Sequence, residues 1–257
     1  MSATYEEFMN EAISVVEKAR NRGVKLRLLG SIAIRIHCPQ YGHFLEKMGR
    51  VLSDIDFVAS SNQGELADFL ESAGYKRDKA SYAVGTLPLT GSDERQFYRN
   101  MERGIDLDIF IDKLNFCHPI YLKDRLIKDF PTITIPDLLL GKMQIVEINE
   151  KDLKDLIVLL LEHDVADSDD KEIIDTSYIC SLLRNDWGFY YTFNLNLDRL
   201  RNLLDYGKPI IKEQKEVIKS KLDTLKESVA STPKSIRWKL RAKIGTKLQW
   251  YQEVGEK

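Results

Sequence analysis

The sequence predicts an α+β protein: an N-terminal α/β domain with a mixed sheet, followed by a C-terminal helical region. Two segments alternate apolar and polar residues with period two, 54–59 and 105–111, as half-buried strands do. Beyond residue 119 the apolar residues recur with helical spacing. We therefore expect one domain over 1–130 and a helical domain with a basic C-terminal tail over 131–257.

The helix and strand signals of the N-terminal half follow one another closely. Thr4 is a plausible N-cap and Gly23 a plausible C-terminal stop for the first helix. The loop 39–53, with Pro and Gly, is long enough to suggest function or mobility. The elements expected in order are a helix over 4–22, a strand over 25–29, a tight turn at Gly30 and Ser31, a helix over 32–38, the loop, a strand over 54–59, a helix over 62–73, and strands near 75–77, 95–99 and 105–111.

The C-terminal half is expected to be mainly helical. Pro136 suits the first position of a helix, because its missing N–H is not needed there. Leu138, Leu139 and Met143 would give this helix its core contacts. Further helices are expected over 151–163, 170–184, 188–206, 210–228 and 233–244.

The composition is that of an ordinary globular protein. The chain has 257 residues, of which 43% are hydrophobic and 30% charged, and three cysteines, too few for a disulfide framework. The longest apolar run, 156–161, is too short to span a bilayer, and the N-terminus lacks the basic and apolar regions of a signal peptide. We expect a cytoplasmic protein with no membrane association.

The near-zero net charge of −2 conceals a division along the chain. Residues 208–257 contain 13 basic and 6 acidic residues, whereas residues 1–207 contain 25 and 34. The tail segment 235–252 mixes basic residues with Trp238 and Trp250, a pattern that can bind a phosphate backbone and stack bases. It is also typical of a solvated helix whose tryptophans dock on the body of the protein. RNA is thus one candidate partner, and the oligomeric state is open.

Three features carry chemistry: the Gly30-Ser31 turn, the pair Asp54 and Asp56, and the acidic strand 105–111. Carboxylates two residues apart on a strand lie side by side and repel each other unless a cation lies between them. Oxygen ligands of this kind suit Mg²⁺, which completes its shell with water and substrate phosphates. Gly30 would let a phosphate approach the backbone, and Ser31 would offer an N–H and a hydroxyl.

A third carboxylate from the strand 105–111 would complete a site for two Mg²⁺ ions, with Mn²⁺ as a substitute. Asp106 and Asp108 share one face of that strand, and both are candidates; we favour Asp108 because it lies deeper in the strand. Together the parts describe phosphoryl-type transfer from a nucleoside triphosphate.

The order Gly-Ser, Asp-x-Asp and strand Asp resembles the nucleotidyltransferase superfamily of the DNA polymerase beta type. The resemblance implies that Asp54, Asp56 and Asp108 (or Asp106) bind the metal and that Gly30 and Ser31 hold the triphosphate. It further implies transfer of an NMP from an NTP, with ATP among the candidates, to an RNA end, a protein or a small molecule, with release of pyrophosphate.

Residues 136–164 resemble a further block found in the AbiEii-like toxins of bacterial toxin–antitoxin systems. In that branch Lys142 and the run Lys151, Asp152 and Asp155 would support the nucleotide site. One spacing departs from the family, since 22 residues separate Ser31 from Asp54, and an insertion at 39–53 would account for it.

Alternatives remain at each level. Lys142 is equally typical of a surface lysine that extends its charge to solvent, and Lys151 with Asp155 of an i,i+4 helix pair. The whole chain is also compatible with a catalytically inactive nucleotide- or RNA-binding regulatory module of the same fold.

Overall fold

The computed structural model describes residues 4–61, 63–78, 94–206 and 210–253 and has the α+β architecture that the sequence predicts. The strands are β1 (Leu26–Leu28), β2 (Ile55–Ala59), β3 (Lys76–Arg77), β4 (Arg95–Asn100), β5 (Ile105–Ile111), β6 (Lys113–Asn115), β7 (Pro119–Tyr121), β8 (Asp164–Ala166) and β9 (Ile173–Asp175). The helices are α1 (Tyr5–Asn21), α2 (Gly30–His37), α3 (His43–Lys47), α4 (Gln63–Ser72), α5 (Ile135–Met143), α6 (Glu150–Glu162), α7 (Thr176–Leu183), α8 (Trp187–Tyr206), α9 (Lys212–Ser231) and α10 (Ile236–Ile244). Across these ranges, no helix has both the length and the apolar character needed to cross a membrane.

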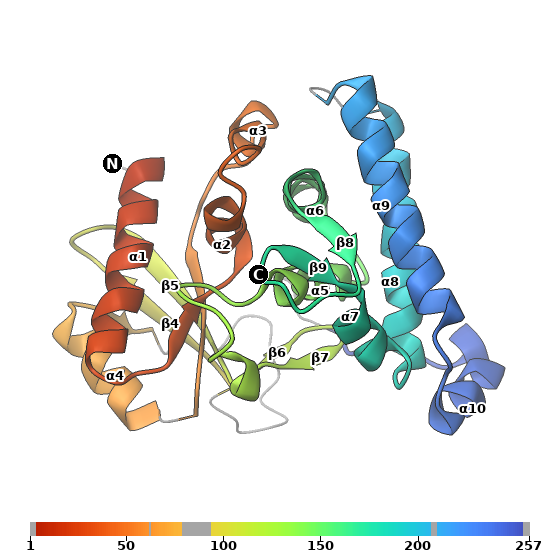
Figure 1. Cartoon of the computed structure of the whole chain (residues 1–257). Helices are drawn as coiled ribbons and strands as arrows, with labels where there is room; N and C mark the ends of the chain where they lie inside the picture. Colours follow the sequence, from red (N-terminus) through yellow and green to blue (C-terminus); the bar gives the residue numbers. More distant parts are fainter. Residues whose placement is uncertain (1–3, 62, 79–93, 207–209, 254–257) are drawn as a thin grey trace.

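The N-terminal half is built on a mixed five-stranded sheet in the order β1-β2-β5-β4-β3. β2 and β5 are parallel, and the other neighbours are antiparallel. In this register Asp56 of β2 lies directly opposite Asp108 of β5. Figure 1 shows the sheet with α1, α2 and α4 on the left and the long pair α8 and α9 on the right.

Local signals in the sequence explain where several elements begin. The Thr4 side chain accepts a hydrogen bond from the Glu7 N–H, and the Glu7 carboxylate accepts one from the Thr4 N–H, so α1 starts with a capping box as its sequence indicates. Gly23, which follows α1, has the positive φ of 75° that favours glycine. Pro136 lies in the first turn of α5, as expected.

The structure corrects three of the expected elements. The segment 39–53 is not all loop, because it contains the short helix α3. The chain after residue 119 is mainly helical, as expected, but it also contains β7, which forms a hairpin with β6, and the parallel pair β8 and β9. The helix expected over 170–184 begins only at Thr176, because Asp175 caps it by accepting from the Ser177 N–H and the three preceding residues form β9.

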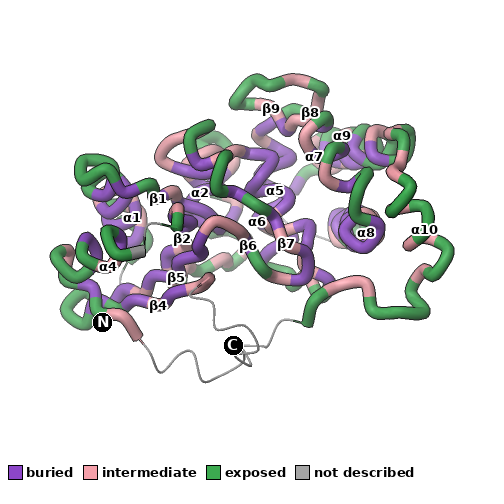
Figure 2. The backbone as a smooth tube through the Cα atoms, turned by 90° about the horizontal axis from the view of Figure 1, so that it is seen from below, coloured by how far each residue is buried: buried purple, intermediate pink, exposed green. Residues whose placement is uncertain are grey.

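One hydrophobic core runs through both halves of the chain. Buried residues extend from α1 through the sheet and α2 to α5, α6, α8 and α9. Figure 2 shows this as purple backbone that continues from the strands into the helices. The division near residue 130 stays a prediction, but the packing shows how a site on the sheet can be supported by the later helices.

The aromatic residues of the basic tail pack on α8. Trp250 donates its indole N–H to Thr192 Oγ1 at 3.1 Å, and its ring meets that of Tyr191 edge-on. Trp238 meets Tyr190 in the same way, with 5.2 Å between ring centroids. Both tryptophans thus dock on α8, and both stay partly exposed.

His118 fastens the β6–β7 hairpin to α8. Its Nε2 lies 2.8 Å from Thr192 Oγ1, and its ring stacks on Phe189 with 5.1 Å between centroids. Only 2% of the residue is exposed.

This histidine makes stability fall in mild acid. Burial lowers the pKa of His118 to about 4, against a smaller opposing attraction from Asp186. The unfolded chain, with a histidine pKa of about 6.5, binds a proton between these values that the folded chain does not. We expect the free energy of unfolding to drop by at most about 3 kcal/mol from pH 7 to pH 4 through this residue. Urea unfolding of the wild type and of His118→Gln at both pH values measures how much of this fall comes from His118. An equal fall in the free energy of unfolding of both proteins would contradict the prediction.

Candidate functional site

The turn at Gly30 lies directly against the Asp56 carboxylate. Gly30 has a φ of 70°, and a Cβ built on it would lie 2.1 Å from Asp56 Oδ2. The preceding residue, Leu29, donates its N–H to the Asp56 carbonyl at 3.0 Å. Helix α2 begins at Gly30, two residues earlier than expected. The start of α2, with its free N–H groups, therefore faces Asp56 of β2.

Replacing Gly30 with Ala should test this close approach. Gly23 is a matched control, because its φ of 75° carries the same backbone strain with nothing within 4 Å of its Cβ position. We expect Gly30→Ala to lower the free energy of unfolding by at least about 1 kcal/mol more than Gly23→Ala, the cost of forcing extra volume into a packed site. Urea unfolding measures both, and equal losses would show that Asp56 moves aside freely.

The carboxylate of Asp108 is held by an arginine from the neighbouring strand. Asp108 is 2% exposed, and Arg95 of β4 donates to its two oxygens at 2.9 and 2.5 Å. The guanidinium carbon also lies 4.8 Å from the centre of the Phe110 ring and 4.9 Å from that of Phe97. This two-pronged contact is the strong form of an arginine–carboxylate pair.

The acidic side chains of the candidate site raise the pKa of Arg95. Burial acts to lower its pKa, but the hydrogen bonds and charge of Asp108, together with the charges of Asp56 and Asp54, raise it above the usual value. The negative charges of Asp108, Asp56 and Asp54 therefore all act on the Arg95 guanidinium.

Asp106 occupies a different environment on the same strand. It pairs with Arg99, whose Nε and Nη2 donate to its two oxygens at 2.6 Å each, and both side chains are about half exposed. Asp108, rather than Asp106, lies across from Asp56. The two arginines of β4 were missed from the sequence, because their pairing with the acidic strand depends on the register between β4 and β5.

The donor chemistry around Asp56 fits a hard divalent cation, but the present arrangement does not form a complete cage. Over the ranges that the structure describes, no three His, Cys, Asp or Glu side chains are grouped closely enough to hold a metal ion. Both oxygens of Asp108 are engaged by Arg95. A divalent cation would therefore compete with Arg95 for this carboxylate.

A second group of predicted residues comes together behind Ser31. Lys142 Nζ lies 2.6 Å from Asp152 Oδ1 and 2.9 Å from Asp155 Oδ2. Ser31 Oγ donates to the other Asp155 oxygen at 3.3 Å, and Arg50 Nε lies 3.5 Å from it. The cluster joins the first turn of α2 to α5 and α6.

Lys142 is an internal ion-pair partner rather than a surface lysine. Its side chain is 14% exposed and that of Asp155 is fully buried. Burial acts to lower the pKa of Lys142, but the charges of Asp155 and Asp152 raise it well above its usual value. The i,i+4 alternative for Asp155 is also wrong, because this carboxylate faces Lys142 and Ser31.

Comparisons with known proteins add little to this geometry. No family model matches the chain, and neither does any curated protein. Among solved structures, the antibiotic-resistance factor ANT(2'')-Ia is similar over 86% of this chain and 93% of that chain, with a TM-score of 0.34 and 11% sequence identity. At that level of similarity, inferences about activity rest on the residues themselves.

Proposed function

We propose that this protein is a nucleotidyltransferase that moves an NMP from an NTP to an acceptor and releases pyrophosphate. The observation that carries the proposal is the contact between the Gly30 turn and Asp56, with Asp108 directly opposite. A phosphate held by the N–H groups at the start of α2 would lie beside these carboxylates. This is the arrangement that positioning and charge neutralisation require in phosphoryl transfer.

Each residue has a role in this proposal. Gly30 and Ser31 would bind the triphosphate, and Asp54, Asp56 and Asp108 would hold Mg²⁺ or Mn²⁺. Neutralising the charge of the leaving pyrophosphate is the chemistry that such an ion supplies when bound. The cluster of Lys142, Asp152 and Asp155 holds Ser31 in place rather than touching the nucleotide, because Lys142 is engaged by both carboxylates and Asp155 accepts from Ser31.

Labelled nucleotides test the proposal directly. Purified protein would be incubated with each of the four α-³²P-labelled NTPs and Mg²⁺, with and without total tRNA and a panel of small hydroxyl compounds. We expect label to transfer to an acceptor with stoichiometric release of pyrophosphate. Absence of transfer with every combination, together with measurable NTP binding, would favour the second function below.

The second candidate function is nucleotide binding without turnover, and the Arg95–Asp108 pair favours it. A guanidinium that holds both oxygens of Asp108 occupies ligand positions that a metal would need. In a regulatory module of this fold, Arg95 would permanently supply the positive charge.

Replacing Arg95 with Gln tests whether the guanidinium occupies a position that a divalent cation would take. Asp108 is nearly buried, so removal of the guanidinium should destabilise the protein, and a divalent cation should then compensate. A unit charge about 4 Å away is worth roughly 4 kcal/mol at an effective dielectric constant of 20, so we expect Mn²⁺ to bind Arg95→Gln at least about tenfold more tightly than wild type. Calorimetric titration and the Mn²⁺-dependent rise in Tm report this. Arg99→Gln, which removes the exposed pair with Asp106, is the matched control.

The acceptor and biological role form a finer part of the proposal. The similarity of 136–164 to AbiEii-like toxins makes a toxin role testable by induced expression, with growth arrest expected for the wild type and not for an Asp56 variant. All three cysteines are free and buried, which suits the reducing cytoplasm proposed here.

A further inference from the structure

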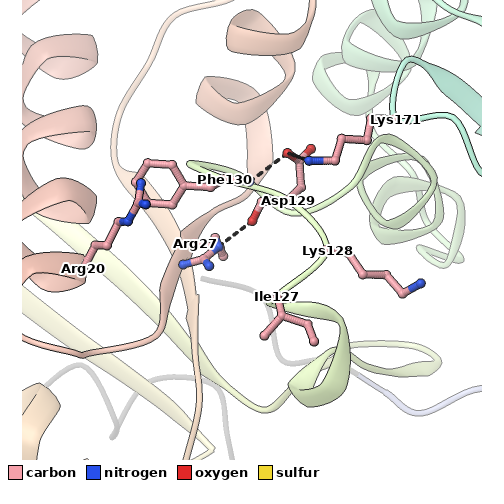
Figure 3. Close-up of a pocket in the computed structure, with 7 residues that line it drawn as sticks. All are labelled: Arg20, Arg27, Ile127, Lys128, Asp129, Phe130 and Lys171. Carbon is pink, nitrogen blue, oxygen red and sulfur yellow. Dashed lines mark hydrogen bonds and ion pairs between the residues drawn. The ribbon is translucent and has the colours of Figure 1, made fainter.

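A basic pocket lies beside β1, where the segment around Phe130 runs along this strand. It has a volume of about 290 Å³, near the lower end for small-molecule sites. Figure 3 shows Arg20 reaching in from α1, Arg27 rising from β1, and Lys171 approaching from the opposite side. The lining residues are Arg20, Arg27, Ile127, Lys128, Asp129, Phe130 and Lys171.

The charges of this pocket are unbalanced. Four of its side chains are cationic and one is a carboxylate, a net of +3. That carboxylate, Asp129, already accepts from the Phe130 N–H at 2.7 Å and lies 3.6 Å from His37 and 4.0 Å from Lys171. Among the described residues, neither Arg20 nor Arg27 has a carboxylate oxygen within 4.0 Å of its guanidinium.

Two guanidinium groups are brought together here in spite of their repulsion. The guanidinium carbons of Arg20 and Arg27 lie 4.6 and 5.1 Å from the centre of the Phe130 ring. Arg27 Nε donates to the Asp129 carbonyl at 2.6 Å, and Arg27 Nη1 donates to the Leu26 carbonyl at 2.8 Å, so this side chain is fixed in place. Burial, and then the charge of Arg20, lower the pKa of Arg27. An anion in the pocket would relieve this repulsion and meet preorganised donors.

The pocket is distinct from the candidate catalytic site but lies beside β1, the strand that leads into Gly30. The segment after Phe130 runs beside β1, with Leu28 donating to the Pro131 carbonyl at 3.0 Å and Ile133 donating to the Leu28 carbonyl at 3.0 Å. Arg27 precedes Gly30 by three residues, or roughly 10 Å of extended chain. The two positions are therefore separate enough to bind different groups.

We propose that this pocket binds the phosphate group of a small phosphorylated molecule. Arg27, which two backbone carbonyls hold in place, and the exposed side chains of Arg20 and the two lysines suit a dianionic oxygen cluster. Ile127, which is 71% exposed, offers an apolar contact for the organic part. The volume accommodates a phosphate with a small substituent. The proposal does not depend on nucleotidyl transfer.

Titration with inorganic phosphate and with glycerol 3-phosphate tests the proposal and separates free phosphate from a phosphate ester. NMR chemical-shift changes locate the site, and we expect them at the backbone amides of Arg27, Lys128 and Phe130. Arg20→Glu should raise the Kd at least about tenfold, since it replaces a charge-assisted donor with a repelling carboxylate. Lys18→Glu is the matched control, because Lys18 is exposed on the same helix about 200° away from Arg20 and should change the Kd less than twofold.

Lys171→Gln provides a second variant that leaves α1 and β1 untouched, and it should also weaken binding. Asp56→Asn should leave the shifts at the pocket unchanged, which separates this proposal from the proposed function. The proposal is overturned if neither compound binds saturably, if Arg20→Glu and Lys18→Glu behave alike, or if the shifts centre on Gly30. Binding of a short single-stranded RNA alone, with neither small compound bound, would overturn it as well.

Discussion

Asp56→Asn is expected to lower nucleotidyl transfer at least about 100-fold, because even groups that merely support a metal ligand are worth 10- to 100-fold. Asp56 faces the Gly30 turn and lies opposite Asp108, so its charge is central to the proposed site. The amide keeps the shape of the side chain and removes the charge. Label transfer from an α-³²P-NTP measures the effect, and circular dichroism with Tm checks that the fold is retained.

Two further substitutions decide which carboxylate of β5 takes part. Asp108→Asn should reduce transfer as strongly as Asp56→Asn, because Asp108 is its partner across the parallel strands. Asp106→Asn should change transfer less than about threefold, because this half-exposed residue is engaged with Arg99, and an exposed pair is worth at most about 1 kcal/mol. Full activity in Asp56→Asn, or an equal loss in Asp106→Asn, would contradict the site.

The local parts of this site could be predicted from the sequence, whereas its spatial pairing could not. Period-two alternation identified β2 and β5 and placed Asp54, Asp56, Asp106 and Asp108 correctly on strands or beside them. Strands alternate in the same way whether their neighbours are parallel or antiparallel. The alternation therefore does not predict which residues of two strands lie opposite each other. The register that places Asp56 opposite Asp108 therefore emerged only from the fold.

Contacts between segments that are distant in the sequence could likewise not be predicted. The pairing of Arg95 with Asp108 depends on an antiparallel register that places the two residues diagonally across β4 and β5. The helix α3 was missed because it has five residues and no side-chain cap at Gly42, so neither periodicity nor a capping motif marks it. The strands β6–β9 have three residues each, which is too short for an alternating pattern.

The cluster around Lys142 shows how a resemblance and the structure complement each other. The resemblance to AbiEii-like toxins singled out Lys142, Lys151, Asp152 and Asp155 as support for the nucleotide site. The structure groups three of them, whereas Lys151 is exposed and lies outside the cluster. In the structure Lys142 at the end of α5 reaches both acids on α6, and Asp155 accepts from Ser31 at the start of α2. These charges therefore link the proposed phosphate-binding turn to the helical half.

Lys142→Met is expected to produce a large loss of stability, because it leaves two buried or nearly buried carboxylates without this cation. Breaking a buried ion pair in this way typically costs about 3–5 kcal/mol. The side chain of Asp155 is fully buried and that of Asp152 is 12% exposed, so water cannot replace the lysine readily. Urea unfolding at pH 7 measures the loss.

The matched control is Lys226→Met, which removes a surface pair with Asp198 at 2.8 Å in which both side chains are about half exposed. It should cost no more than about 1 kcal/mol, because solvent screens such a pair. The double variant Lys142→Met with Asp155→Leu should recover part of the loss, since removing both charges of a buried pair is far less costly than removing one. If Lys142→Met and Lys226→Met cost the same, the cluster does not fasten α2 to the helical half, and Ser31 must be positioned by the backbone alone.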